Sequence, residues 1–350
     1  MSYKPNYTIT NRILNAIAKI EALNTYISKA DILPVWEKKL RHRAKVESSH
    51  YSTRIEGNRL TLEQVEKVSK NEKVTGATEK DVREVHNYFN VLDFIKQISE
   101  KKTTVNHEVI LKMHYITIDG ILTGDLKGKY RTQQNVIKDT STGEVVYLPP
   151  AAEYVYRMMD GLVSFLNTEK SERSPSGEIH PLLKAGISHY EFVRIHPFMD
   201  GNGRVARALT MLVLYLNGYD IRKLFALEEY YEQDRERYCN AIESVQKHKG
   251  SLTTWLEYFL EGMVFELERV KSEIENVKET GQTVVPKDLN PRQISVVSYI
   301  QKNGYITNKD YRKLFKVSNK TAQTDLQKLV DKDILIIEGK GRSVRYKMKT

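Results

Sequence analysis

The chain has 350 residues, 40% of them hydrophobic, and a formal net charge of +10, a length that predicts two or three domains with buried cores. No run approaches 18 apolar residues and the first stretch, MSYKPNYTITNR, is polar, which argues against a membrane span or signal peptide and predicts a cytoplasmic protein with no membrane partner. The single cysteine, Cys239, excludes an intrachain disulfide.

Two helices are predicted before residue 57. Apolar residues recur at three- and four-residue spacing over residues 10–30, and a second helix begins near Pro34. The second helix ends in the sequence SSHYSTRIEG. Taken alone, Ser52-x-x-x-Glu56-Gly57 is a helix end followed by a glycine cap.

A β-hairpin is predicted within an otherwise helical region. Amphipathic helices over residues 79–99 and 106–117 precede it, and their histidines (His86, His107 and His114) are interpreted as core or surface residues because no metal-ligand spacing connects them. Short β-prone runs at 135–138 and 144–148 flank the turn-rich DTSTG. The outer edge of such a hairpin has no sheet to join and can bind an extended peptide by strand addition, although a plain surface hairpin is the alternative.

The stretch HPFMDGNGRVAR, which starts at His196, combines several residue types that chemistry needs. A predicted helix over residues 181–195 ends before Pro197, so the histidine lies at the end of a rigid element, where a general base is best held. The DGNG segment cannot continue a helix, but its glycines let backbone amides approach a ligand closely.

A second helix is predicted to begin at Asn202 or Gly203. Its first turn offers unpaired amides and the positive end of a helix dipole, which together favour phosphate. Arg204 and Arg207, at i and i+3, can reach the same anion. The chemistry that such a group supports is phosphoryl or nucleotidyl transfer.

Two further side chains fit this chemistry. Asp200 is placed to hold Mg²⁺ against phosphate oxygens, because that ion prefers one or two carboxylates together with substrate phosphates. His196 would take the proton from an attacking hydroxyl. A capped helix-loop-helix joint with surface arginines remains the purely structural alternative.

The stretch resembles the Fic family signature, His-Pro-Phe-x-Asp/Glu-Gly-Asn-Gly-Arg-x-x-Arg, at every defined position. The resemblance implies a mainly helical core with a hairpin flap, and transfer of AMP from ATP, with Mg²⁺, to a Ser, Thr or Tyr hydroxyl of a protein. It implies that His196 is the base, Asp200 the magnesium ligand and Arg207 the γ-phosphate contact. The anion cradle implied is Gly201, Asn202, Gly203 and Arg204. Family members often form dimers, so a homodimer is a further expectation.

The resemblance also changes how three other segments are interpreted. Ser52-x-x-x-Glu56-Gly57 resembles the family's inhibitory motif, which predicts a salt bridge between Glu56 and Arg207 and a carboxylate that holds the guanidinium bidentately and excludes the γ-phosphate. The hairpin corresponds to the flap, with Val145, Val146 and Tyr147 as candidate contacts for nucleotide and target. Tyr238 is predicted to stack near adenine, with a structural core role as the alternative.

Positive charge is concentrated at the C-terminal end. Residues 287–350 contain 15 Lys or Arg and 6 Asp or Glu, so any electrostatic attraction to nucleic acid belongs there. Three helices followed by the strands ILIIE and SVRYKM predict a winged helix-turn-helix. The third helix would present Asn319, Lys320, Gln323 and Thr324 to a major groove, with Lys340 and Arg342 on a neighbouring phosphate strand. Docking of another protein is the alternative role of this domain.

The sequence therefore predicts a mainly α protein with four segments. These are a helical segment with the inhibitory motif at residues 1–75, a Fic core at 76–278, a linker at 279–289 and a winged helix-turn-helix at 290–350. The predicted function is protein AMP transfer to a target protein or to itself, inhibited by Glu56. The alternatives are a DNA-binding regulator whose core only senses nucleotide, and a Fic-type enzyme that transfers or removes another phosphate-containing group.

Overall fold

The computed structural model describes residues 3–32, 34–122, 126–138, 143–167, 179–280, 290–332, 334–339, 341 and 344–349. Its contacts divide the chain into two units, one made of Met1–Ser28 and Arg41–Val270 and the other of Lys29–Leu40 and Lys271–Thr350. The predicted division at residue 75 stays a prediction, and residues on both sides of it lie in the first unit. Most of the predicted linker, residues 281–289, lies outside the described residues.

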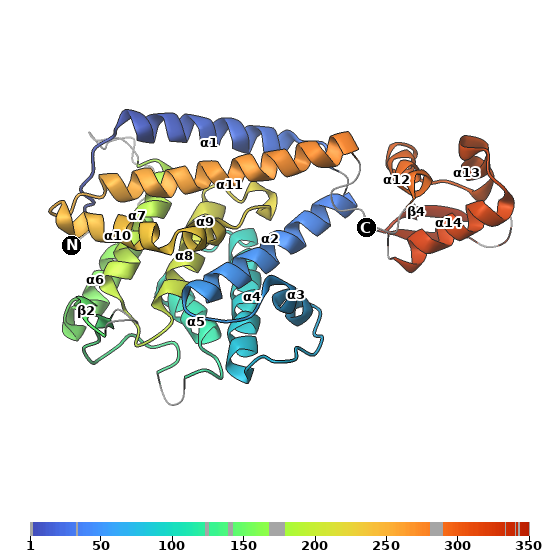
Figure 1. Ribbon diagram of the computed structural model, residues 1–350. Helices are drawn as coiled ribbons and strands as arrows, with labels where there is room; N and C mark the ends of the chain where they lie inside the picture. Colours follow the sequence, from blue (N-terminus) through green and yellow to red (C-terminus); the bar gives the residue numbers. More distant parts are fainter. Residues whose placement is uncertain are drawn as a thin grey trace. The chain divides into compact units, whose positions relative to one another are not determined.

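The mainly helical fold class is confirmed (Figure 1). The helices before the linker are α1 (Asn11–Lys29), α2 (Pro34–Ile55), α3 (Leu62–Ser69), α4 (Glu79–Glu100), α5 (His107–Thr117), α6 (Ala152–Leu166), α7 (Pro181–Ile195), α8 (Asn202–Leu216), the 3₁₀ turn η1 (Ile221–Lys223), α9 (Leu227–Gln233), α10 (Arg235–Lys247) and α11 (Thr253–Thr280). The hairpin strands are β1 (Ile137–Lys138) and β2 (Val145–Tyr147), paired antiparallel.

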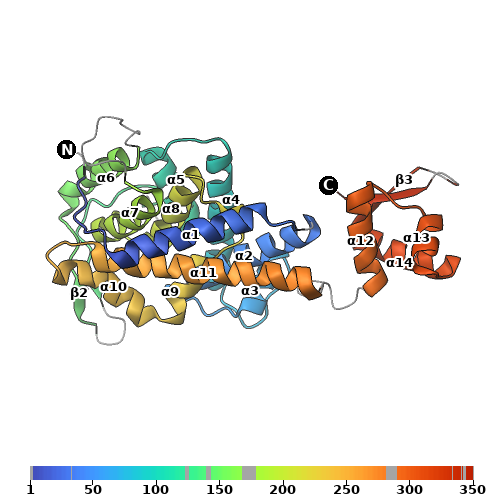
Figure 2. The ribbon, with the colours of Figure 1, turned by 90° about the horizontal axis from the view of Figure 1, so that it is seen from above.

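Helices α7 and α8 form the centre of the first unit, and both are buried along most of their length. Pro181 occupies the first turn of α7, as predicted, because the missing N–H is one of those that a helix start leaves unpaired. Helices α1 and α11 run side by side in both views, joined by ion pairs such as Lys19–Glu268 at 2.6 Å (Figures 1 and 2). The signature loop lies between the end of α7 and the start of α8.

Two helices, not one, lie between the signature helix and Lys249. The structure has α9 and α10 on either side of Asp234. The backbone of Asp234 is non-helical, with φ −141° and ψ 76°, and its side chain accepts a hydrogen bond from the amide of Arg237. An aspartate that caps in this way begins a new helix, because its carboxylate satisfies an amide that would otherwise lack a partner.

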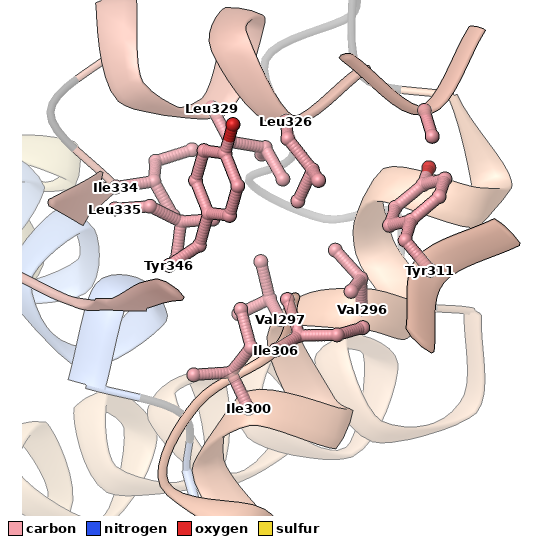
Figure 3. Packing of buried hydrophobic residues seen from close by; sticks show 11 residues of the cluster. Val296, Val297, Ile300, Ile306, Tyr311, Leu326, Leu329, Ile334, Leu335 and Tyr346 are labelled. Carbon is pink, nitrogen blue, oxygen red and sulfur yellow. The ribbon is translucent and has the colours of Figure 1, made fainter. Parts of the chain in front are cut away.

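The second unit contains the predicted winged helix-turn-helix. Its elements are α12 (Pro291–Asn303), α13 (Asn308–Phe315), α14 (Asn319–Asp331), β3 (Leu335–Glu338) and β4 (Arg345–Met348). The two strands pair antiparallel, with Ile336 opposite Lys347. Figure 3 shows the apolar core that the three helices and the wing share, which includes Val297, Leu326 and Tyr346.

A buried carboxylate joins the helices of the second unit. Asp325 on α14 accepts hydrogen bonds from Asn290, Arg292 and the hydroxyl of Tyr311, at 2.7 to 3.0 Å. The amide side chain of Gln293 donates to the carbonyl of the same aspartate at 2.9 Å. Since these partners come from the segments of α12 and α13, they hold α14 in a fixed orientation on its two neighbours.

A cluster of charged side chains joins α2, α9 and α11 in the first unit. Arg269 on α11 lies 2.9 Å from Glu266, 3.2 Å from Glu47 of α2 and 3.6 Å from Glu229 of α9. Arg43, which is half exposed, also bonds Glu47, at 2.6 Å. Glu266 is fully buried, and burial raises its pKa to about 7, an effect that Arg269 only partly offsets.

This cluster predicts that stability falls as pH rises. The folded-state pKa of Glu266, about 7, lies above its unfolded value near 4.3. At a pH between these two pKa values, the folded chain therefore holds a proton that the unfolded chain has lost. We expect the free energy of unfolding of the first unit to fall by about 2–3 kcal/mol from pH 4.5 to 7 through this group, and Glu266→Gln to remove that fall. Urea unfolding at pH 5 and pH 8 measures it.

The matched control is Glu268→Gln, on the same helix. The Glu268 side chain is about half exposed and pairs with Lys19, so its replacement should change stability by well under 1 kcal/mol at either pH. Equal pH dependence in the wild type and in Glu266→Gln would show that the buried carboxyl does not titrate in this range.

Candidate active site

The signature loop is held by its own side chains. Asn202 accepts a hydrogen bond from the amide of Phe198 and donates to the carbonyl of the same residue, both at 2.8 Å. Gly201 has φ +78°, and a side chain there would approach Ile118 to 3.0 Å. The loop therefore closes into a fixed turn that presents the first residues of α8, and the side chain of Asn202 is used within the loop.

His196 lies at the end of α7 with a left-handed backbone, φ 50° and ψ 58°. Its Nδ1 lies 3.3 Å from the carbonyl oxygen of Val193. Because a carbonyl can only accept, this contact favours the tautomer that protonates Nδ1 and leaves the Nε2 lone pair free. Burial lowers the pKa of His196 to about 4, against smaller opposing effects from that carbonyl and from Glu56. The imidazole is neutral at pH 7 and can accept a proton.

The predicted ion pair between Glu56 and Arg207 is present. Arg207 NH2 lies 2.8 Å from Glu56 Oε1. The bidentate geometry that we expected is absent, because NH2 alone bonds the carboxylate. The same NH2 also donates to the Ser52 carbonyl at 2.7 Å, and Nε donates to the Ser52 hydroxyl at 2.9 Å. Arg207 is only 3% exposed, and both ends of the Ser52-x-x-x-Glu56 motif contact its guanidinium.

The Glu56 carboxylate also lies directly against the start of α8. A Cβ built on Gly203 would be 2.2 Å from Glu56 Oε1, so only glycine allows this approach. Burial raises the pKa of Glu56, but Arg207 and Arg204 outweigh it and hold the pKa below its usual value. An ionised carboxylate thus lies at a helix start, where the amides and the dipole also favour a phosphate.

Arg204 differs from Arg207 in having spare donors. Its side chain is 3% exposed, and its carboxylate neighbours, Glu84 and Asp200, each lie 3.6 Å away. Within the described part of the chain, its Nε and NH1 have no hydrogen-bond acceptor. A buried guanidinium with unused donors is costly unless an anion completes it, which fits a ligand such as a triphosphate.

Asp200 is the candidate metal ligand. Its side chain is half exposed, and its Oδ1 accepts a hydrogen bond from the amide of Gly201 at 2.5 Å. No group of three or more His, Cys, Asp or Glu suited to a metal occurs among the described residues. An accessible carboxylate beside a helix start whose amides and dipole favour phosphate fits Mg²⁺, which completes its coordination with phosphate oxygens and water.

A cavity of about 250 Å³ brings most of the predicted residues together. Its lining includes Glu56, Val146, Tyr147, His196, Gly203, Arg207 and Tyr238. Val145, in contrast, is 56% exposed and is absent from the lining. Gly201, Asn202, Arg204 and Asp200 form the loop and helix start beside the cavity rather than its wall.

Tyr238 lies in the core and reaches the cavity, and its stacking near adenine stays a prediction. It lies on α10, is 5% exposed and lines the cavity. Its hydroxyl is 2.8 Å from Nε2 of His189, and its ring stacks on Tyr231 with centroids 4.6 Å apart. Tyr238 is therefore a core residue whose edge reaches the cavity. Its neighbours Cys239, Ile242, Glu243 and Gln246 continue that wall.

Sequence reasoning missed two residues that support the loop. His114 on α5 stacks on Phe198 with centroids 3.7 Å apart, and its Nε2 lies 3.2 Å from the carbonyl of Asp200. The amide of Gly128 donates to His114 Nδ1 at 3.1 Å, so Nε2 carries the proton. The second is Arg131, which bonds the carbonyl of His196 at 2.9 Å.

In the second unit, the candidate DNA contacts Asn319, Lys320, Gln323 and Thr324 all lie exposed on α14. The Thr324 hydroxyl donates to the carbonyl of Lys320 at 2.9 Å. The predicted wing contacts Lys340 and Arg342 lie outside the described residues. No described helix is both long enough and apolar enough to span a bilayer.

Comparison with known proteins agrees with this geometry. Residues 104–214 match the Fic/DOC family model, and residues 292–347 match the DeoR-like helix-turn-helix domain. The chain therefore carries a Fic/DOC domain followed by a DeoR-like helix-turn-helix domain, as its signature and C-terminal pattern predict.

Similar proteins include two named as adenylyltransferases. "Protein adenylyltransferase Fic" of Nematostella vectensis is 31% identical over 195 residues, 52% of this chain and 41% of that protein. "Protein adenylyltransferase fic-1" of Caenorhabditis briggsae is 30% identical over 173 residues, 49% of this chain and 32% of that protein. The match thus spans less than half the length of either relative.

A solved structure shows the fold. A Fic family protein from Desulfovibrio desulfuricans aligns with a TM-score of 0.67 over 99% of this chain and 98% of that chain, at 23% identity. The likeness confirms the fold class.

Proposed function

We propose that this chain is a protein adenylyltransferase, which transfers AMP from ATP to a hydroxyl of a target protein and of itself. The observation that carries the proposal is a single cavity that contains a neutral imidazole, His196, and the guanidinium of Arg207 beside the start of α8. A base and a triphosphate seat within one cavity are what nucleotidyl transfer requires. The names of the two similar adenylyltransferases support the same reaction.

The proposed step assigns each part of the site one task. The triphosphate binds at the start of α8, with Arg204 and Arg207 on its β and γ groups. The acceptor hydroxyl oxygen attacks the α-phosphorus, forming the new O–P bond while the bond from that phosphorus to the bridging oxygen breaks. Pyrophosphate leaves with the bond electrons. The hydroxyl proton passes to Nε2 of His196, which the contact with Val193 leaves unprotonated.

Asp200 would hold Mg²⁺ in this scheme. When bound, the ion supplies positive charge that offsets the charge of the phosphates. The half exposure of the carboxylate and its position beside the start of α8 support the assignment. The contact of Oδ1 with the Gly201 amide keeps the carboxylate turned along the loop, so the loop itself orients it.

The target segment would bind along the flap. Val145, Val146 and Leu148 are all more than half exposed, and their strand has one unpaired edge. An extended peptide can pair with such an edge and bring a Ser, Thr or Tyr hydroxyl toward His196. Tyr147 anchors the strand, because its hydroxyl donates to the carbonyl of Arg194 at 2.8 Å.

We further propose that Glu56 inhibits the enzyme in its resting state. The Glu56 carboxylate and the γ-phosphate would use the same cation, Arg207, and the same helix start at Gly203. Two anions cannot share that position without strong repulsion. ATP then binds weakly, or binds with its α-phosphate displaced from the line of attack.

Transfer of labelled AMP tests the reaction. The Glu56→Gly protein is incubated with ATP labelled at either the α- or the γ-phosphate, and label on protein is counted. Label from the α position alone supports AMP transfer, whereas label from the γ position alone indicates phosphate transfer. Release of label from pre-modified protein indicates AMP removal. No transfer together with intact DNA binding would favour the alternative, a DNA-binding regulator that only senses nucleotide.

The helix-turn-helix domain supports a second activity, DNA binding. Its match to a DeoR-like domain and the four exposed side chains of α14 fit insertion of that helix into a major groove. The excess of Lys and Arg in residues 287–350 adds attraction to phosphate.

We expect Lys320→Glu to weaken binding to a random 30-base-pair duplex about tenfold and to reduce its salt dependence. Gel shifts at 50 and 200 mM salt measure both. The control is Lys101→Glu, which makes the same charge change at the end of α4 in the first unit. Absence of salt-sensitive binding by the wild type would leave protein docking as the role of this domain.

A further inference from the structure

Arg131 is buried between the flap and the end of α7, with 2% of its surface exposed. Its guanidinium donates four hydrogen bonds: Nε to His196 O at 2.9 Å, NH1 to Gln133 O at 3.1 Å, and NH2 to Pro150 O at 2.5 Å and Ile195 O at 3.4 Å. Among the described residues, all its acceptors are backbone carbonyls. A buried charge satisfied in this way is rigidly placed, because every bond depends on the path of the main chain.

Two of these bonds fix the residue that carries the base. The carbonyls of Ile195 and His196 lie at the end of α7, where a helix leaves carbonyls without partners and favours a cation. The backbone amide of Arg131 adds a bond to Pro197 O at 2.8 Å. His196 itself has the left-handed backbone that non-glycine residues rarely adopt. Arg131 thus contacts all three residues of the turn that aims the imidazole.

The other two bonds fix the flap. Gln133 precedes strand β1 and Pro150 follows strand β2, so one guanidinium closes the base of the hairpin. Asn135 adds a parallel contact, because its side chain donates to the carbonyl of Phe198 in the signature loop at 2.9 Å. The base-bearing turn and both flap ends therefore meet at a single side chain that a loop supplies from 65 residues earlier in the chain.

We propose that Arg131 is a positioning residue that sets the distance between the acceptor hydroxyl, aligned by the flap, and Nε2 of His196. The inference rests on the proposed function, since only a reaction needs that distance. Arg131 is absent from the lining of the nucleotide cavity, so it acts on the chemical step and leaves nucleotide binding alone. Lysine cannot replace it, because one ammonium group cannot reach carbonyls in the planar, forked arrangement that guanidinium spans.

The test uses Arg131→Lys in the Glu56→Gly background. We expect kcat for AMP transfer to fall about 100-fold, the loss typical of a misplacement near 1 Å, while KM for ATP and the calorimetric Kd for ATP change less than threefold. The imidazole ¹⁵N signals of His196, assigned with His196→Ala, should move. Amide hydrogen exchange at Val146 and Tyr147 should become faster.

The matched control is Arg269→Lys, a mostly buried arginine of the same unit that bonds carboxylates of α2, α9 and α11. It should lower Tm and leave kcat unchanged. An Arg131→Lys protein that keeps its kcat, or that loses ATP affinity as much as kcat, overturns the proposal.

Two further measurements separate the role of Arg131 from misfolding of the variant and from failure of the proposed function. Asn135→Ala removes one flap contact without disturbing the buried guanidinium, and it should lower kcat several-fold. This variant decides the question if Arg131→Lys does not fold. An unchanged kcat in Asn135→Ala would count against the proposal. If Glu56→Gly transfers no AMP, the proposed function fails. The NMR and exchange measurements then still decide on Arg131, because unchanged signals and exchange rates would show that it positions neither element.

Discussion

Replacement of Glu56 by glycine should raise AMP transfer by about 100-fold, the upper part of the range that a coupling of 1–3 kcal/mol between two sites allows. The reason is competition for one place. Glu56 Oε1 lies 2.8 Å from Arg207 and directly against Gly203, so removal of the carboxylate opens both the cation and the helix start to phosphate. Transfer is measured from α-labelled ATP, and affinity for Mg·ATP by calorimetry.

Thermal unfolding of the same variant separates binding from folding. Loss of Glu56 leaves Arg207 buried with Ser52 as its remaining partner in this turn, at an expected cost of about 1–2 kcal/mol in stability, discounted because a third of the Glu56 side chain is exposed. Mg·ATP should restore that loss, since the triphosphate supplies the missing anion. The wild type should gain much less from the same ligand.

A matched substitution elsewhere tests the specificity of the effect. Glu72→Gly makes the same exchange in an exposed turn after α3 and should leave transfer and ATP affinity unchanged. Glu56→Gln should lie between the wild type and Glu56→Gly, because an amide oxygen can still accept from Arg207 but carries no charge. An unchanged transfer rate in Glu56→Gly would remove the inhibitory role, whatever the affinity shows.

The parts of the site that could be predicted are those whose partners lie close in the sequence or share a strong local pattern. The helix end at His196, the glycine turn and the start of α8 all follow from the order of residues between 181 and 207. The Glu56 to Arg207 pair spans 151 positions and could be predicted only through the resemblance to the Fic inhibitory motif. Its monodentate geometry could not be predicted. It depends on how α2 packs on α8, which brings the Ser52 oxygens to Arg207 as competing acceptors.

The contacts of the two supporting residues could not be identified from the sequence. Arg131 bonds only carbonyl oxygens, and every residue has one, so its partners cannot be identified by type. His114 is a lone histidine on an apolar helix, a pattern that more often marks ordinary packing. The break at Asp234 does have a local signal, an aspartate that caps the helix through the amide of Arg237, three residues later.

Replacement of His196 by alanine should lower kcat for AMP transfer about 1,000-fold, within the range that a positioned general base contributes. Affinity for ATP should change less than threefold, because Arg204, Arg207 and the amides of α8 remain. The measurement uses the Glu56→Gly background, where the nucleotide seat is open. His86→Ala is the control: this histidine lies exposed on α4, and its loss should leave kcat unchanged.

The pH profile of the same reaction identifies the base. Only the neutral imidazole accepts a proton, and burial lowers the pKa of His196 to about 4. As pH falls through that value, the base is protonated and kcat/KM drops. From pH 6 to 8 the imidazole stays neutral, so this group causes no change in kcat/KM. The Glu56→Gly background lacks the inhibitory carboxylate, whose protonation in acid would raise the rate and oppose this drop. Because Glu56 also raises the pKa of His196, its removal should move the drop to a lower pH, not a higher one. A half-maximal rate near pH 6.5 would instead indicate a solvent-exposed imidazole, and with it a site more open than the one seen between α7 and α8.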